Sequence, residues 1–242
     1  MNIYTTDKIR NVVLLGHGGS GKTSLAEAFG YLSGITSRMG KVDDGNTLSD
    51  YSKEEQKRHF SISTSVIPIE WEGYKINIID TPGYFDFVGE VEEAVSAADA
   101  AVIVVSGKAG VEVGTEKAWA LCDKYNLPRM VYVTEMDVDD ASFRQVVEDL
   151  TARYGKVIAP HFQPIRENEK LVGYVNVIKN AGRRYTGLGQ REECEIPDYS
   201  REYLESYREN LLEAVAETSE EFMDRYFNGD EFSEAEIVAA LH

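Results

Sequence analysis

Cysteine and long apolar runs are scarce in this chain of 242 residues. Its two cysteines, Cys122 and Cys194, stand far apart in the sequence, which argues against a disulfide framework and suits a reducing cytosol. The most apolar stretch, residues 94–105, contains Asp99 and is far too short to span a bilayer. Residues 1–7 lack the basic and apolar regions of a secretion signal. These absences predict a soluble, cytoplasmic protein with no membrane partner.

Basic residues are also few, since 25 Lys and Arg stand against 42 Asp and Glu, for a net charge of -17. The segment from Arg191 to His242 carries 16 acidic and 4 basic residues and therefore a net charge of -12. An acidic surface repels nucleic acid, so we expect no direct DNA binding. The acidic segment is either a solvated helical face that aids solubility or a docking surface for a basic protein partner.

The most informative motif that is present lies near the start of the chain. Residues 16–24 read Gly-His-Gly-Gly-Ser-Gly-Lys-Thr-Ser, between a strand-like apolar run at 11–15 and a helix-forming run at 22–32. This is the phosphate loop G-x-x-x-x-G-K-S/T in its usual strand–loop–helix context. The glycines let backbone N–H groups point at a phosphate, and the helix N-terminus adds partial positive charge. The expected phosphate contacts are Gly18, Gly19, Ser20, Gly21, Lys22, Thr23 and Ser24.

This loop predicts that the chain binds a nucleoside triphosphate or descends from a protein that did. Lys22 would reach the β- and γ-phosphates, and the Thr23 hydroxyl would hold Mg²⁺. Kinases, ATPases and GTPases all use such loops, so the loop alone does not choose among them.

Strand-like and helix-like runs alternate through the first 150 residues. Apolar runs predict buried strands, and residues 66–79 predict a hairpin turned by Glu72-Gly73. Strands separated by helices predict an α/β fold, with a doubly wound, mostly parallel sheet and an antiparallel edge. The polar segment 36–60 is expected to be a long mobile loop.

The pattern changes near Gly155, which we take as a domain boundary. A hairpin is predicted within residues 157–178, and three helices follow it. We therefore predict a phosphate-loop domain of residues 1–155 and a smaller α+β part of residues 156–242 with acidic helices.

Short motifs predict the helix boundaries in this second part. Thr218 with Glu221 and Ser233 with Glu236 have the spacing of capping boxes, which start helices. Asn228-Gly229 is typical of a helix end, since both residues tolerate a left-handed backbone.

A second motif narrows the class of nucleotide-binding protein. Asp80-Thr81-Pro82-Gly83 directly follows the strand-like run at 76–79. A carboxylate at Asp80 can hold Mg²⁺ through water, and the Gly83 N–H can contact the γ-phosphate. Alone, this tetrapeptide could be an ordinary type II turn. After a phosphate loop and a buried strand, it indicates the switch of a GTPase.

Together these residues resemble bacterial elongation factor G, and more narrowly its divergent paralogues with a Gly-Gly-Ser-Gly-Lys-Thr loop. The similar stretches are Ile-Arg-Asn at 9–11, the phosphate loop, Asp-Thr-Pro-Gly-Tyr-Phe-Asp-Phe at 80–87, and Arg-His-Phe-Ser-Ile at 58–62 as switch I. The resemblance covers nearly the whole chain. It implies a GTPase domain of the phosphate-loop type, with residues 156–242 as an inserted subdomain.

The resemblance also implies ligands and partners. GTP or GDP and Mg²⁺ would be bound, GTP would be hydrolysed, and the ribosome would be the partner. The acidic subdomain would meet the ribosomal stalk proteins. The residues that match the family's metal site are Thr23, Ser61 and Asp80, and those that match its catalytic positions are Lys22, Gly83 and Tyr84.

Two of these positions depart from the family. Ser61 replaces a threonine but keeps the hydroxyl that Mg²⁺ needs. Tyr84 replaces the histidine that positions the attacking water, and a phenol, with a pKa of about 10, is a poor base near neutrality. We therefore expect slow hydrolysis in the absence of ribosomes.

The stretch that would recognise the base is altered further. Asp137 matches the aspartate that reads guanine and can accept two hydrogen bonds from the ring. Glu135 replaces the lysine whose stem covers the base, and Thr134 replaces the asparagine that braces the phosphate loop. We expect weaker GTP binding than in the family. The family's Ser-Ala loop does not follow Asp137, so the chain is expected to be an N-terminal fragment of a longer factor.

Three interpretations remain open at this point. The first is an elongation factor G-like GTPase, and the second is another ribosomal GTPase such as a tetracycline-protection factor. The third is a degenerate GTP sensor that does not hydrolyse its nucleotide. The altered switch and base positions favour the sensor, whereas the intact Lys22, Thr23 and Asp80 oppose it. A kinase or ATPase would leave the Asp80–Gly83 motif and Asp137 without a purpose.

Overall fold

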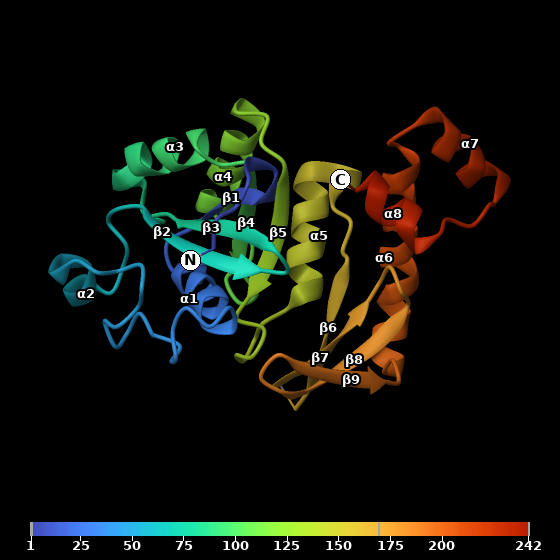
Figure 1. Cartoon of the computed structure of the whole chain (residues 1–242). Helices are drawn as coiled ribbons and strands as arrows, with labels where there is room; N and C mark the ends of the chain where they lie inside the picture. The colour runs from blue at the N-terminus through green and yellow to red at the C-terminus, as the bar shows by residue number, and fades with distance from the viewer. Residues whose placement is uncertain (1, 169, 242) are drawn as a thin grey trace. The chain divides into compact units, whose positions relative to one another are not determined.

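The computed structural model of the chain describes residues 2–168 and 170–241. The chain forms two compact units, residues 1–135 and 136–242 (Figure 1). The change in sequence pattern at Gly155 comes later than this division, because helix α5 (Phe143–Tyr154) groups with the second unit. Among the described residues, no helix has the length and apolarity that crossing a membrane requires.

The first unit is built on a five-stranded sheet with the order β2-β3-β1-β4-β5. The pairs β1–β3, β1–β4 and β4–β5 are parallel, whereas β2 is antiparallel to β3, so the predicted mostly parallel sheet with an antiparallel edge is confirmed. The strands are β1 (Ile9–Gly16), β2 (Ser65–Trp71), β3 (Tyr74–Asp80), β4 (Ala100–Ser106) and β5 (Arg129–Thr134). The helices are α1 (Lys22–Leu32), α2 (Lys53–Arg58), α3 (Val88–Ser96) and α4 (Val113–Lys124).

Helices cover both faces of this sheet, with α1 on one side and α3 and α4 on the other (Figure 1). The carboxyl-terminal parts of β1 and β3 and most of β4 are buried, and they are mainly apolar, as buried parallel strands are. Leu14, Ile78 and Val104 form one core cluster with Leu25 and Ala26 of α1. Burial of each large aliphatic side chain contributes about 1.5–3 kcal/mol. This packing fixes the carboxyl ends of β1 and β3, where the two motifs lie.

The segment 36–60 is irregular apart from α2, as the sequence predicts. It is nevertheless packed, because several of its polar side chains are buried. The helix α2 is started by a full capping box, in which Ser52 and Glu55 exchange hydrogen bonds with each other's backbone. The buried polar residues of the segment are Thr47, Ser49, Asp50 and Glu55.

The second unit is an α+β structure with a four-stranded antiparallel sheet of order β6-β7-β8-β9. The strands are β6 (Phe162–Glu167), β7 (Lys170–Asn176), β8 (Ala181–Gly187) and β9 (Gln190–Cys194). The predicted hairpin corresponds to β6 and β7, whereas β8 and β9 were not predicted. The helices that follow are α6 (Asp198–Ala216), α7 (Glu220–Asn228) and α8 (Glu234–Ala240).

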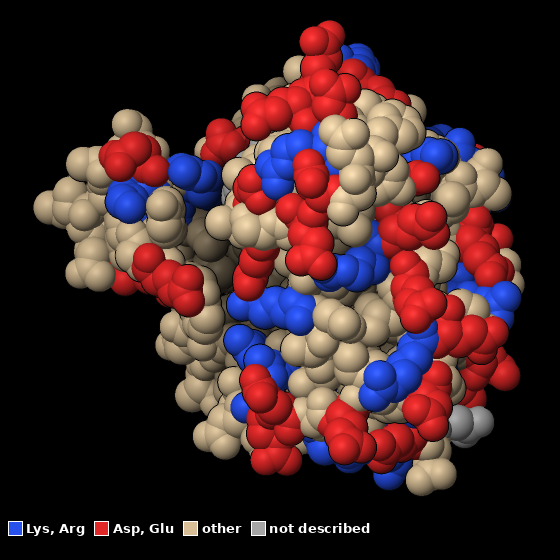
Figure 2. All heavy atoms as spheres, turned by 90° about the vertical axis from the view of Figure 1, so that its right-hand side faces the viewer, with Lys and Arg blue, Asp and Glu red and all other residues tan. Residues whose placement is uncertain are grey.

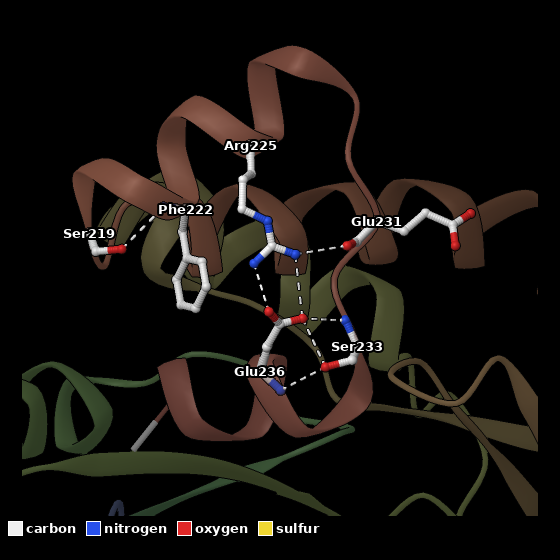
Figure 3. Close-up of polar contacts among 6 residues, drawn as sticks. All are labelled: Ser219, Phe222, Arg225, Glu231, Ser233 and Glu236. Carbon is white, nitrogen blue, oxygen red and sulfur yellow. Dashed lines mark hydrogen bonds and ion pairs between the residues drawn. The ribbon is translucent and has the colours of Figure 1, made fainter.

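A cluster of polar contacts joins α7 to α8 (Figure 3). Arg225 of α7 donates to Glu236 of α8 at 2.6 Å and to the carbonyl oxygen of Glu231. Ser233 caps α8 and forms the predicted capping box with Glu236. The hydrogen bond from Arg225, followed by those from Ser233, lowers the pKa of Glu236 to about 2.

Acidic side chains cover more of the face shown in Figure 2 than basic ones do. The helix α6 carries exposed carboxylates on the side opposite its buried residues, and α7 carries further exposed carboxylates. The helical part of the acidic segment is therefore exposed to solvent, which agrees with both interpretations of this segment. The exposed acids on these two helices are Asp198, Glu202, Glu205, Glu209, Glu220, Glu221 and Asp224.

Candidate nucleotide site

The phosphate loop leaves the carboxyl end of β1 and turns directly into α1. Gly16, Gly19 and Gly21 have positive φ angles of 146°, 85° and 87°, which glycine adopts without strain. Gly16 is also required by space, because a Cβ there would lie 2.4 Å from the carbonyl oxygen of Val104. The backbone of the loop thus turns where only glycine fits, as expected of a phosphate cradle.

Lys22 is buried at the start of α1, with 5% of its surface exposed. Its Nζ donates to the carbonyl oxygens of Gly16 at 3.0 Å and His17 at 2.7 Å, so the ammonium lies inside the loop. Burial lowers the pKa of Lys22 to about 8, and the nearby charges of Asp80 and Glu112 oppose that shift. A phosphate at this position would supply a further anion to the ammonium.

Asp80, at the end of β3, is 1% exposed, and neither of its carboxyl oxygens has a hydrogen-bond partner among the described residues. Burial raises the pKa of Asp80 to about 6, although the nearby hydroxyls of Thr23 and Ser49 and the charge of Lys22 oppose the rise. A buried carboxyl with unpaired oxygens is costly unless a cation or ligand completes it.

Thr23 and Ser61 bring two hydroxyls to the same place. Their Oγ atoms are 3.1 Å apart, although 38 residues separate them in the sequence. Mg²⁺ takes oxygen ligands and keeps several of its waters. The hydroxyls of Thr23 and Ser61 and the carboxyl of Asp80 therefore fit this ion, and phosphate oxygens would complete its shell.

Asp50 is a buried acid that sequence reasoning missed. It is 2% exposed, its Oδ1 has no hydrogen-bond partner among the described residues, and it interacts with Ser61. Burial raises the pKa of Asp50, the Ser61 hydroxyl opposes the rise, and the charge of Glu55 adds to it. A single aspartate in a polar stretch carries no pattern that indicates burial, so no signal in the sequence could have found it.

The two switch-like segments meet at the phosphate loop. A Cβ at Gly83 would lie 2.5 Å from Lys22 Nζ and 2.6 Å from Gly18 Cα, so only glycine allows this approach. The next residue, Tyr84, lies against Gly18 and makes an edge contact with the ring of Phe60, with 4.8 Å between centroids. The three predicted catalytic residues, Lys22, Gly83 and Tyr84, are thereby brought together.

Thr134 lacks the amide of the family's asparagine but still braces the phosphate loop. Its hydroxyl donates to the carbonyl oxygen of Ser20 at 2.7 Å. Thr134 lies at the end of β5, so the brace joins this strand end to the loop. Glu135 has a positive φ of 55° and accepts a hydrogen bond from Ser106. The role of Asp137, an exposed residue of the second unit, stays a prediction.

His17 is the remaining polar residue of the loop. Its Nδ1 accepts the Gly114 N–H at 3.3 Å, and its Nε2 lies 3.5 Å from Glu112. Gly114 has to be glycine, since a Cβ there would lie 2.4 Å from His17 Cα. His17 therefore braces the loop against the start of α4.

Residues 7–240 match the elongation factor Tu GTP-binding domain. The chain belongs to this family. Over 237 residues it is 39% identical to elongation factor G of Thermotoga petrophila and 38% identical to that of Thermotoga maritima. Each match covers 97% of this chain and 34% of the relative, so the chain spans about a third of the length of these proteins.

Solved structures share the fold of this chain. A crystal structure of a Thermus thermophilus protein is 40% identical, with a TM-score of 0.88 over 96% of this chain and 35% of that one. A bacterial selenocysteine-specific elongation factor has a TM-score of 0.51 at 23% identity over 62% of this chain and 24% of that one, which shows a shared fold alone. The GTP-binding domain family is thus shown over nearly the whole chain and not by the loop and switch motifs alone.

Proposed function

We propose that this chain is the GTP-binding and GTP-hydrolysing part of a ribosome-associated, elongation factor G-like protein of the cytoplasm. The buried Asp80 carboxyl carries the proposal, because its unpaired oxygens lie near the Thr23 hydroxyl, itself paired with Ser61. Such a group does not stabilise a hydrophobic core, since burial of a carboxyl without a partner is unfavourable. A GTPase needs one at its Mg²⁺.

Phosphate binding is assigned to the loop. The backbone N–H groups and the Lys22 ammonium would hold the phosphates, and Thr23, Ser61 and Asp80 would hold Mg²⁺. When bound, the ion neutralises charge on the phosphate oxygens. The residues proposed to line the phosphates are Gly18, Gly19, Ser20, Gly21, Lys22, Thr23 and Ser24.

In this proposal, hydrolysis depends on groups of this chain that position the terminal phosphate and the attacking water. The Gly83 N–H would donate to the terminal phosphate, and Lys22 would stabilise its charge. Tyr84 would orient the attacking water by its hydroxyl, because a phenol does not accept the proton readily near neutrality. The expected result is slow turnover that ribosome binding accelerates.

Base and partner recognition extend the proposal. Asp137 would accept the two ring N–H donors of guanine, with Glu135 beside the nucleotide, and adenine would leave Asp137 unpaired. The relatives named elongation factor G support a ribosomal partner. The exposed carboxylates of α6 and α7 support contact of this unit with basic stalk proteins.

The test uses full-length protein with labelled GTP and ATP, followed by hydrolysis with and without ribosomes. GTP should bind more tightly than ATP, and Lys22→Ala and Asp80→Asn should weaken binding. Lys57→Ala, at an exposed position of α2, is the matched control. Tighter binding of ATP than of GTP would overturn the guanine assignment.

A second candidate is a GTP sensor that does not hydrolyse its nucleotide. The packing of Tyr84 between Gly18 and Phe60 favours it, because a ring held there is restricted in reaching a water molecule. Single-turnover hydrolysis on ribosomes separates the two functions, since a sensor retains GTP and a GTPase releases phosphate.

A further inference from the structure

Glu27 is a buried acid on α1 that the proposed chemistry does not use. It is 1% exposed and lies four residues after Thr23, so both side chains project from the same face of the helix. Its Oε2 accepts the N–H of Gly40 at 2.9 Å, and its Oε1 accepts the N–H of Leu48. One carboxyl group therefore fastens two points of the segment 36–60 to α1.

The loop between these two points is closed by further hydrogen bonds. The Lys41 N–H donates to Asn46 Oδ1 at 2.7 Å, which holds the two ends of the loop together. Gly40 is fitted to this arrangement, since a Cβ there would lie 2.8 Å from Glu27 Oε2 and 2.6 Å from the Asn46 carbonyl oxygen. Residues 40–48 thus form a compact loop built around the Glu27 carboxyl, which we call the 40–48 loop.

The 40–48 loop leads directly to the metal-binding end of the site. The Asp50 N–H donates to Thr47 Oγ1 at 3.2 Å, and the carbonyl oxygen of Ser49 accepts the Ser65 hydroxyl at 2.7 Å. The Ser61 hydroxyl lies near enough to the Asp50 carboxyl to oppose the rise in its pKa that burial causes. Leu48 and Asp50 are only two residues apart, so the bond from Leu48 to Glu27 restricts where the Asp50 carboxyl can lie.

A separate carboxyl holds the other side of Ser61. Glu55 accepts the N–H groups of Ile62 at 3.0 Å and Ser63 at 3.1 Å. Glu55 therefore fixes the residues that follow Ser61, and Asp50, whose position depends in part on the 40–48 loop, lies near the Ser61 hydroxyl. Loss of the Glu27 bonds would loosen Asp50 while the Glu55 bonds persist.

We propose that Glu27 is a positioning residue for Mg²⁺ binding: by fastening the 40–48 loop to α1, it holds Asp50 against Ser61 at the metal-binding end of the nucleotide site. The inference rests on the proposed function. It adds that the Glu27 carboxyl sets how strongly nucleotide binding depends on Mg²⁺, although this carboxyl touches neither metal nor nucleotide. Contacts with the phosphates and the base would not depend on it.

The test is Glu27→Gln in the full-length protein. A carboxamide has one acceptor oxygen, and its NH₂ group would face one of the two N–H donors, so one buried bond is lost. The Mg²⁺ concentration that half-saturates GTP binding should rise about tenfold, while GTP affinity in EDTA stays unchanged. Hydrogen exchange at the amides of Gly40 and Leu48 should accelerate.

Two further variants keep the result interpretable. Gly40→Ala disrupts the same contact from the loop side and should reproduce both effects, which matters if Glu27→Gln does not fold. Glu54→Gln removes an exposed carboxyl of α2 that pairs with Arg58, and it should change neither readout.

Each outcome decides a separate point. Native protein that does not bind GTP would contradict the proposed function, and hydrogen exchange would still test the Glu27 bonds. Native protein that binds GTP with Mg²⁺, together with a Glu27→Gln variant of unchanged Mg²⁺ dependence, would overturn the positioning role. Unchanged exchange at Gly40 and Leu48 would overturn the fastening of the loop itself.

Discussion

The ring of Tyr84 lies so close to Gly18 that a Cβ at position 18 would come within 3.2 Å of two ring carbons. The tyrosine is therefore accommodated because the phosphate loop has no side chain at this position. Phe60 covers the ring from the other segment, with its centroid 4.8 Å away. These three residues pack against one another, so the effects of substitutions at these positions on the free energy of unfolding should be coupled.

Coupling between Gly18 and Tyr84 is the first prediction. Gly18→Ala should destabilise the native protein by about 1–3 kcal/mol, because overpacking forces the ring to move. In a Tyr84→Ala background the same change should cost much less, which gives a coupling of about 0.5–3 kcal/mol in a double-mutant cycle. Denaturant unfolding of the four proteins measures it, and strictly additive effects would show that the contact carries no energy.

Hydrolysis by the Tyr84→His variant is the second prediction. An imidazole can both orient and deprotonate water near neutral pH, whereas a phenol orients it only. Single-turnover hydrolysis on ribosomes should rise about tenfold or more, since such groups contribute on the order of 10²–10⁴ in rate. Tyr125→His, at the end of α4, is the control. Equal rates for the native protein and Tyr84→His would refute the role given to Tyr84.

The parts of the fold that were predicted correctly are those with strong local patterns. The apolar runs of β1 and β4 and the glycine pattern of the phosphate loop depend on short stretches of sequence. The strands β8 and β9 were missed because Gly, Arg and Glu dominate residues 181–194, without the alternation of a half-buried strand. Their stability comes from pairing of β8 with β7 and of β9 with β8, which no local pattern reveals.

The residue that makes a particular hydrogen bond was harder to predict where neighbouring or alternative side chains could make the same bond. The second helix of the acidic segment is capped by Ser219, whose hydroxyl accepts the Phe222 N–H, and not by the predicted Thr218. Thr218 instead donates to the carbonyl oxygen of Val215. Likewise, Thr134 braces the phosphate loop through a hydroxyl in place of an amide. In both cases the backbone position, which the sequence does not contain, decided which group could reach.

Acid sensitivity of the α7–α8 contact is the third prediction. Hydrogen bonds from Arg225 and Ser233 lower the pKa of Glu236 from 4.5 to about 2. A carboxyl whose pKa is lower in the folded protein stabilises it fully above the unfolded pKa, and this stability is lost as the pH falls from about 4.5 to 2. Because the pair is partly exposed, high salt should weaken the effect.

The measurement is thermal unfolding of the native protein and Glu236→Gln between pH 6 and pH 2. The difference in Tm should be largest at the neutral end and should shrink as the pH falls. Glu205→Gln, at an exposed position of α6, should keep the native pH profile. A Tm difference that stays constant over this range would contradict the predicted protonation of Glu236.

Loss of GTP affinity at alkaline pH is the last prediction. Burial lowers the pKa of Lys22 to about 8, and phosphate binding requires the charged form. Nucleotide phosphates raise this pKa again, so affinity should be constant below pH 8 and fall up to about tenfold per pH unit above it. Lys22→Arg keeps its charge throughout and should bind more weakly but lose this dependence, while ionisation of the guanine ring affects both proteins equally. Titrations of the native protein and Lys22→Arg with GTP between pH 7 and pH 9 test this prediction. Affinities that change in parallel with pH for the two proteins would show that Lys22 does not titrate at the site.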